Sequence, residues 1–186
     1  MKFGWDVSTS VIGFAAFSSS GSFVESRYCD LRKVDTGLIS KADVALSFVK
    51  KINSDFELWR GGHFQDHFVE DRLKSFMVGR TSKETLLKLT AFNALVSWMV
   101  WRECLLGNAA RGKLIYLHPS TVKAAMKRFG LIIPKGSDQK KQLTLDFVRT
   151  REKGFAPDVN RNGKDQPWCY DQADAYIIAM AGMSKL

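Results

Sequence analysis

The N-terminal part of the chain alternates between hydrophobic segments and polar turns. Residues 3–7 and 11–17 are rich in aromatic and β-branched side chains, which favour strands, and residues 8–10 between them are Ser-Thr-Ser, a typical turn composition. This pattern predicts a β-hairpin. Residues 23–31 follow a Gly-Ser turn and predict a third strand.

Helical spacing of apolar residues begins after this strand. An amphipathic helix is predicted from apolar positions that recur every three or four residues, at Leu38, Ala42, Ala45, Leu46, Val49 and Ile52. Residues 67–70 are a short apolar run that predicts a fourth strand ending at Glu70, and a loop is expected over residues 71–80. Thr81 and Glu84 have the spacing of a capping box, so a helix is expected from there to about Leu106.

The helix expected over residues 86–106 is apolar on more than one face. Phe92, Trp98 and Trp101 do not share one stripe, and the charges of Lys88 and Arg102 make the segment unsuitable as a membrane span. A helix of this kind either crosses the core or forms a contact between two subunits.

The remaining elements are predicted from residues that typically begin, cap or end helices and strands. A short strand is predicted over residues 113–117 and a helix from Pro119 to Gly130. Ser137 or Asp138 is expected to cap the next helix. Residues 154–167, rich in Gly, Pro and Asn, predict a loop that leads into a final apolar helix.

The length and the charge of the chain narrow the class of protein. With 186 residues and 45% hydrophobic content, we expect one domain, residues 1–186, with one sizeable core. The formal net charge is +9, and residues 111–153 hold eleven Lys and Arg against three acidic residues. A solvated helical surface would interleave both signs, so this excess favours a nucleic-acid partner.

The cysteine pattern indicates the redox state of the cellular compartment in which the protein is expected. Cys29, Cys104 and Cys169 are widely spaced and form no C-x-x-C pair, which argues against a disulfide framework or a zinc site. The N-terminus lacks a basic region followed by a long apolar run, so no secretory signal is expected. The pattern predicts a reducing, cytoplasmic setting.

Four carboxylates are embedded in apolar elements. Asp6 and Glu70 each stand at the end of a predicted strand, and Asp171 and Asp174 lie three residues apart near the start of the last helix, on one face. Taken singly, Asp6 could start the turn and an acid near a helix N-terminus stabilises the helix dipole. Taken together, clustered acids favour hard divalent cations, so we expect Mg²⁺ or Mn²⁺ and two-metal phosphodiester hydrolysis.

Basic residues near these acids are candidates for binding DNA. Lys140 and Lys141 fall in the first turn of a predicted helix, where they oppose the helix dipole. A phosphate at that N-terminus would explain their placement, and two solvated lysines are the ordinary alternative. Lys123 and Lys135 belong to the same basic segment.

Three segments together resemble a known family. Gly4-Trp5-Asp6-Val7-Ser8-Thr9-Ser10, Glu70 at a strand end and Asp171-Gln172-Ala173-Asp174 are similar to RuvC-type Holliday-junction resolvases of the ribonuclease H and retroviral-integrase superfamily. The stretches Val122-Lys123 and Gly136-Ser137-Asp138-Gln139-Lys140 resemble the region where that family keeps a catalytic lysine. Insertions around residues 56–66 and 154–167 indicate a bacteriophage or otherwise diverged member.

The resemblance implies a fold and a set of roles. The fold would be α/β and ribonuclease H-like, with a mixed five-stranded sheet whose first three strands form an antiparallel meander. The metal ligands would be the four carboxylates, and Lys140, with Lys141 as the alternative, would stabilise the transition state. The family is dimeric, which would suit the helix near residues 86–106. The family also wedges the junction with an aromatic side chain. In this sequence the closest position holds Leu73, and the first aromatic residue after it, Phe76, is the candidate wedge.

Different functions share parts of this pattern. Gly-Trp-Asp-Val-Ser-Thr-Ser also looks like the first phosphate loop of actin-like kinases and ATPases, but a second such loop and a longer chain are lacking. The pattern is also compatible with an inactive nucleic-acid-binding module of the same fold, and with a nuclease that acts on flaps, forks or RNA–DNA hybrids.

Overall fold

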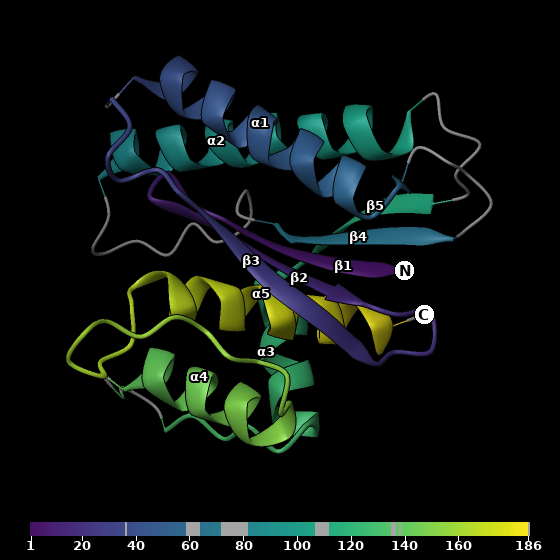
Figure 1. Cartoon of the computed structure of the whole chain (residues 1–186), viewed down its shortest axis with the longest axis vertical. Coiled ribbons are helices and arrows are strands. Elements are labelled where there is room, and N and C mark those ends of the chain that lie inside the picture. Colours follow the sequence, from purple (N-terminus) through teal and green to yellow (C-terminus); the bar gives the residue numbers. More distant parts are fainter. Residues whose placement is uncertain are drawn as a thin grey trace.

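The structure is a computed structural model that describes residues 1–35, 37–58, 64–71, 82–106, 112–134, 137 and 139–185. An N-terminal run of three strands is followed by helices that alternate with two further strands, and the chain ends with three successive helices. Figure 1 shows one central sheet with helices on both of its faces. Among the described residues, no helix has the length and the hydrophobicity to cross a membrane.

The sheet has five strands in the order β3-β2-β1-β4-β5. The strands are β1 (Lys2–Val7), β2 (Val11–Phe17), β3 (Phe23–Asp30), β4 (Gln65–Glu70) and β5 (Gly112–Leu117). β1, β2 and β3 form an antiparallel meander, while β4 pairs in parallel with both β1 and β5. The predicted mixed sheet with its N-terminal meander is therefore confirmed, and β4 begins two residues earlier than the sequence indicated.

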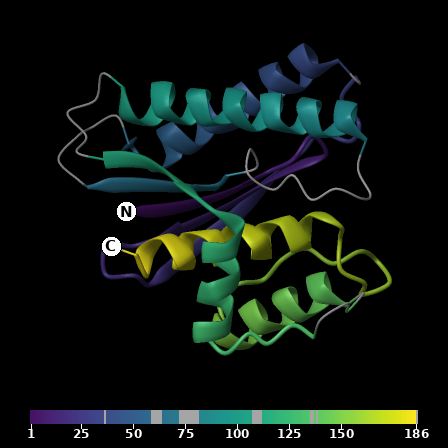
Figure 2. The same ribbon diagram turned by 180° about the vertical axis from the view of Figure 1, so that it is seen from behind.

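Two helical layers cover the sheet (Figures 1 and 2). One face carries α1 (Leu38–Asp55) and α2 (Lys83–Val100), which continues as a π-helical turn, η3 (Trp101–Leu105). The other carries α5 (Trp168–Met183) directly on the strands, with α3 (Pro119–Arg128) and α4 (Lys140–Arg151) packed outside it. Each face has its own hydrophobic core, because successive residues of the central strands point to opposite faces.

Helix α5 approaches the sheet unusually closely at two glycines. A Cβ atom on Gly4 of β1 would overlap the main-chain oxygen of Ala175, and one on Gly13 of β2 would overlap that of Asp171. The absence of side chains at Gly4 and Gly13 therefore allows the close approach of the two backbones. The contact brings the first turns of α5 against the strand ends that carry Asp6.

Three helix boundaries differ in detail from the predictions. Ser82, one residue after the predicted Thr81, caps α2, because its Oγ accepts the Thr85 N–H at 3.1 Å. Gln139 and not Ser137 stands at the N-cap of α4. Ser137 Oγ accepts the Gln139 N–H at 3.2 Å, two residues too early to cap the helix. The end of the α2 segment is a π turn closed by Leu106 N–H and Trp101 C=O at 2.8 Å, a local hydrogen-bond shift that hydrophobic periodicity does not report.

Candidate active site

The candidate site starts where two parallel strands end side by side. β1 and β4 pair in parallel with Trp5 opposite Val69, so the next residues, Asp6 and Glu70, are neighbours at the same edge of the sheet. Asp6 also pairs with Gly13 on β2, and it is 4% exposed. The amide of the buried Asn93 on α2 donates to the main-chain oxygen of Glu70 at 3.4 Å, which ties this strand end to the helix behind it.

Helix α5 brings the other two carboxylates to this strand end. Burial and the nearby charge of Asp6 raise the pKa of the Asp171 carboxyl to about 6. The same two causes, in the same order, raise the pKa of Asp174 well above its usual range. The charges of Lys140 and Lys141 lower the pKa of Asp174, but they do not cancel the increase caused by burial and by Asp6. The side chains of Asp6, Asp171 and Asp174 thus interact electrostatically across the contact between α5 and the sheet.

A cleft of about 110 Å³ opens beside these residues. It is lined by Asp6, Glu70 and Asp174 together with Lys123 of α3 and Lys140 of α4, and its apolar wall comes from α3 and α5. Asp171 does not line this cleft. The structure therefore places three of the four predicted carboxylates and two of the predicted lysines around one opening.

The two neighbouring lysines of α4 have different surroundings. Lys140 lines the cleft, whereas the Lys141 ammonium lies 6.0 Å from the centre of the Tyr170 ring. The charge of Lys141 nevertheless reaches both Asp171 and Asp174 and lowers their pKa values. Lys140 is the one in position to contact a group inside the cleft.

Arg32 is a basic residue near the site that sequence reasoning did not identify. It follows β3, forms an ion pair with Asp30 at 2.7 Å, and lies over the Trp168 ring at 5.1 Å. Its charge also lowers the pKa of Asp171. Arg32 lies outside the basic segment at residues 111–153, so only the contact of β3 with α5 could have revealed it.

Several predicted site residues lie outside the described residues. These are Lys135, Asp138, the wedge candidate Phe76 and its neighbour Leu73. Most of the loop expected over residues 71–80 falls there as well.

The donor set suits a hard divalent cation in charge and in atom type. Carboxylate oxygens are the ligands that Mg²⁺ and Mn²⁺ prefer, and the raised pKa values show negative charge crowded into a buried place. Among the described residues, however, no three Asp, Glu, His or Cys side chains stand close enough together to enclose a metal ion. Binding a cation would require the carboxylates to turn toward one another.

The raised pKa values predict a pH-dependent stability that Asp174→Asn should remove. A carboxyl whose pKa is higher in the folded than in the unfolded state destabilises the fold progressively as pH rises from about 4 through the folded-state pKa. In metal-free buffer, Asp174→Asn should therefore match the wild type near pH 4 and melt about 2–6 °C higher at pH 8. Thermal melts across this pH range measure the difference.

The matched control is Asp43→Asn, an exposed carboxylate of α1 on the other face of the sheet, which should leave the melting temperature unchanged at every pH. Added Mg²⁺ should raise the melting temperature of the wild type at pH 8 more than that of Asp174→Asn. If the wild-type protein without metal were as stable at pH 8 as at pH 5, this would contradict the raised pKa values assigned to the carboxyl groups of this site.

Among known proteins, the chain resembles others in its fold and not in its sequence. No protein-family model matches the chain, and no curated protein matches it. Among solved structures, RuvC of T. thermophilus in complex with a Holliday-junction substrate superposes with a TM-score of 0.55 at 12% identity, covering 96% of this chain and 89% of that one. A second structure of Thermus thermophilus RuvC gives a TM-score of 0.52 at 12% identity, covering 96% and 90%. The chain therefore has the ribonuclease H-like fold of these RuvC structures.

Proposed function

We propose that this protein is a metal-dependent endonuclease that resolves four-way DNA junctions. The observation that carries the proposal is the cleft in which Asp6, Glu70 and Asp174 face Lys123 and Lys140. Its support comes from the net charge of +9, and from the shared fold with a RuvC that was solved with a Holliday junction.

The arrangement suits hydrolysis of a phosphodiester. Bound Mg²⁺ or Mn²⁺, one or two ions, would lower the pKa of the attacking water and neutralise charge on the phosphoryl oxygens. Asp6, Glu70 and Asp174 would hold the cation, with Asp171 tuning the charge beside them. The ammonium groups of Lys123 and Lys140 would bind the phosphate and stabilise the extra negative charge of the transition state. Water would then add to phosphorus while one P–O ester bond breaks.

The direct test is cleavage of a synthetic four-way junction in Mg²⁺ or Mn²⁺, beside linear duplex, flap, fork and RNA–DNA hybrid substrates. We expect symmetric cuts in the junction and little cutting of the duplex. Preferential cleavage of the flap, fork or hybrid would favour the alternative nuclease. Tight junction binding, unaffected by metal and without any cutting, would favour an inactive binding module.

The two lysines of α4 should differ in their effect on cleavage. Lys140→Ala is expected to slow cleavage at saturating junction by about 10²-fold, because its charge would act on the transition state. Lys141→Ala, the matched control one residue away, should change the rate by about fivefold or less, as an exposed charge near Tyr170 would. Single-turnover rates measure both, and equal small effects would discard the catalytic role of Lys140.

We also propose a homodimer formed through α2. The exposed side of α2 and the start of η3 carry an apolar stripe with helical spacing, made of Leu87, Ala91, Ala94 and Trp98 of α2 and Trp101 of η3. Leu87, Trp98 and Trp101 are 66%, 47% and 41% exposed, although one face of α2 is already buried in the core. If a second copy of the chain packs its own stripe against this one, both stripes are covered, as in an isologous contact.

Trp98→Lys is expected to convert the dimer to a monomer, because it places a charge in the centre of the stripe. The wild type should have twice the chain mass of 21.0 kDa by sedimentation equilibrium. Ile39→Lys is the control, because Ile39 is an 80% exposed apolar residue of α1 that does not belong to the stripe, and this variant should remain dimeric. A monomeric wild type, on and off DNA, would contradict this contact.

A further inference from the structure

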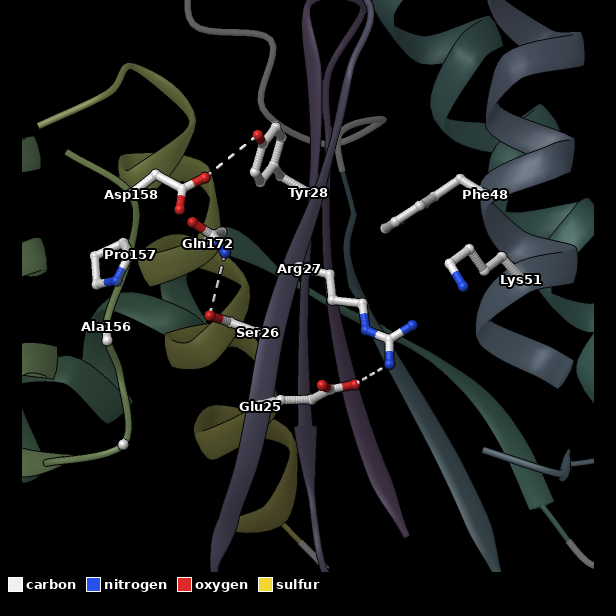
Figure 3. Close-up of a pocket in the computed structure, with 11 residues that line it drawn as sticks. Glu25, Ser26, Arg27, Tyr28, Phe48, Lys51, Ala156, Pro157, Asp158 and Gln172 are labelled. Carbon is white, nitrogen blue, oxygen red and sulfur yellow. Dashed lines mark hydrogen bonds and ion pairs between the residues drawn. The ribbon is translucent and has the colours of Figure 1, made fainter. Parts of the chain in front are cut away.

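A cavity of about 520 Å³ lies along the free edge of the sheet, away from the carboxylate cleft. Four consecutive residues of β3, Glu25, Ser26, Arg27 and Tyr28, line it, and they span about 10 Å of strand. One wall comes from Phe48 and Lys51 of α1, and the other from Gln172 of α5 with Gly154, Ala156, Pro157 and Asp158 (Figure 3). The cavity thus contacts both faces of β3, and its floor is the outer edge of that strand.

The main chain of β3 offers hydrogen-bonding groups to this cavity. β3 pairs only with β2 among the described strands, so its other side is an edge. Leu31 N–H donates to Ser10 C=O at 2.9 Å, and antiparallel pairing alternates, so Cys29 and Arg27 direct their main-chain groups toward β2. The N–H and C=O groups of Ser26 and Tyr28 therefore point outward, where an added strand could bind them.

A buried side chain in the wall also lacks a partner. Gln172 is 5% exposed, and its Nε2 donates to Ser26 Oγ at 3.2 Å. Its Oε1 is buried without a hydrogen-bond partner among the described residues. Figure 3 shows the Gln172 amide on the same side of β3 as Ser26, next to Asp158. An unsatisfied buried acceptor is costly, so this position favours a ligand that donates a hydrogen bond.

The two walls differ in chemistry. On the α5 side, the cavity is lined by acceptors, namely the Asp158 carboxylate and the Gln172 amide oxygen, and the described residues that line this side include no Lys or Arg. On the α1 side, it is lined by the Phe48 ring, and the charges are already paired, Arg27 with Glu25 and Asp55, and Lys51 with Asp55. A strand with basic side chains toward α5 and apolar side chains toward α1 would complement both walls.

We propose that this edge of β3 is a docking site for an extended segment of a partner protein, which pairs antiparallel with β3 and alternates basic and apolar residues. Main-chain hydrogen bonds to Ser26 and Tyr28 give the affinity, and the two walls select the side chains. A second copy of this chain fits less well, because it would bring its own α1 and residues 154–158 against walls that already flank the edge. The site is separate from the nuclease cleft, so it does not depend on the proposed function.

The test uses the acetylated, amidated peptide Val-Lys-Val-Lys-Val and the full chain without DNA. Binding is followed by amide chemical shifts, which should move at Ser26, Tyr28 and Gln172 and saturate with a Kd below about 1 mM. In antiparallel pairing, the peptide residues whose side chains face α5, here the two lysines, direct their N–H groups toward β3. N-methylation of both lysines should therefore weaken binding about tenfold or more, while N-methylation of the central valine should have little effect.

Substitution at Ser26 provides the matching test on the protein. Ser26→Pro removes the outward N–H but keeps the pairing with β2, which an edge strand tolerates. Ser26→Ala loses the same hydroxyl and keeps the N–H. We expect Ser26→Pro to weaken peptide binding about tenfold relative to Ser26→Ala. The peptide Val-Glu-Val-Glu-Val should bind more weakly than the lysine peptide.

Three outcomes would overturn the proposal. The first is no shift at Ser26, Tyr28 or Gln172 with the lysine peptide. The second is equal binding of the two N-methylated peptides, which would mean that the N–H groups of the lysines make no specific contact with β3. The third is concentration-dependent self-association that Ser26→Pro abolishes, which would assign this edge to a second copy.

Discussion

Replacing Asp6 with Asn is expected to lower the rate of junction cleavage by about 10²-fold or more, while junction affinity changes little. Asp6 is buried at the point where β1, β4 and α5 meet, and its charge raises the pKa values of both Asp171 and Asp174. Asn keeps the shape of the side chain but removes the charge that a cation would need. Affinity should persist because phosphate contacts from lysines and arginines dominate binding to DNA.

Asp66→Asn is the matched control for this substitution. Asp66 is also a buried carboxylate, 7% exposed, but it pairs with Lys2 at the opposite end of β1 and β4. Its loss should affect stability and leave the cleavage rate per folded molecule nearly unchanged. Cleavage rates at saturating junction and binding by electrophoretic mobility shift separate the two effects. Equal loss of binding and cutting in Asp6→Asn would mean that Asp6 is structural.

The carboxylates could be identified in the sequence because each breaks a local hydrophobic pattern. An acid that ends a strand of aromatic and β-branched residues, as Asp6 and Glu70 do, conflicts with simple burial and indicates a special role. Asp174 within an otherwise apolar helix gives the same signal. The strands themselves follow from short runs of aromatic and β-branched residues bounded by turns, so most of the sheet could also be predicted.

The assembly of the site could not be read from local pattern. Asp6 and Glu70 become neighbours only through the parallel pairing of β1 with β4, which are separated in sequence by β2, β3 and α1. The different surroundings of Lys140 and Lys141 depend on where α4 begins, and the N-cap is Gln139 without a side-chain hydrogen bond. The free edge of β3 depends on strand order, which hydrophobicity along a single strand does not encode.

Gly13→Ala is expected to lower the free energy of unfolding by about 3 kcal/mol and to reduce cleavage as well. The added Cβ would overlap the main-chain carbonyl of Asp171, which belongs to a helix and cannot rotate away as a side chain would. Helix α5 would have to shift from β2 at the turn that carries Asp171, and Asp174 follows one turn later. Denaturant midpoints measure the stability, and single-turnover rates measure the displacement of the site.

Gly37→Ala separates this steric effect from the general cost of replacing a glycine. Gly37 stands at the N-cap of α1 with φ of −61°, and an added Cβ would meet only Ser40 Oγ, at 3.6 Å. Its replacement should cost about 0.5 kcal/mol and leave cleavage unchanged. If Gly13→Ala were as mild, α5 would not lie against β2 as described, and the electrostatic interaction of Asp6 with Asp171 and Asp174 would lose its structural basis. The two alanines therefore test whether the close approach of α5 to the sheet is what assembles the carboxylates.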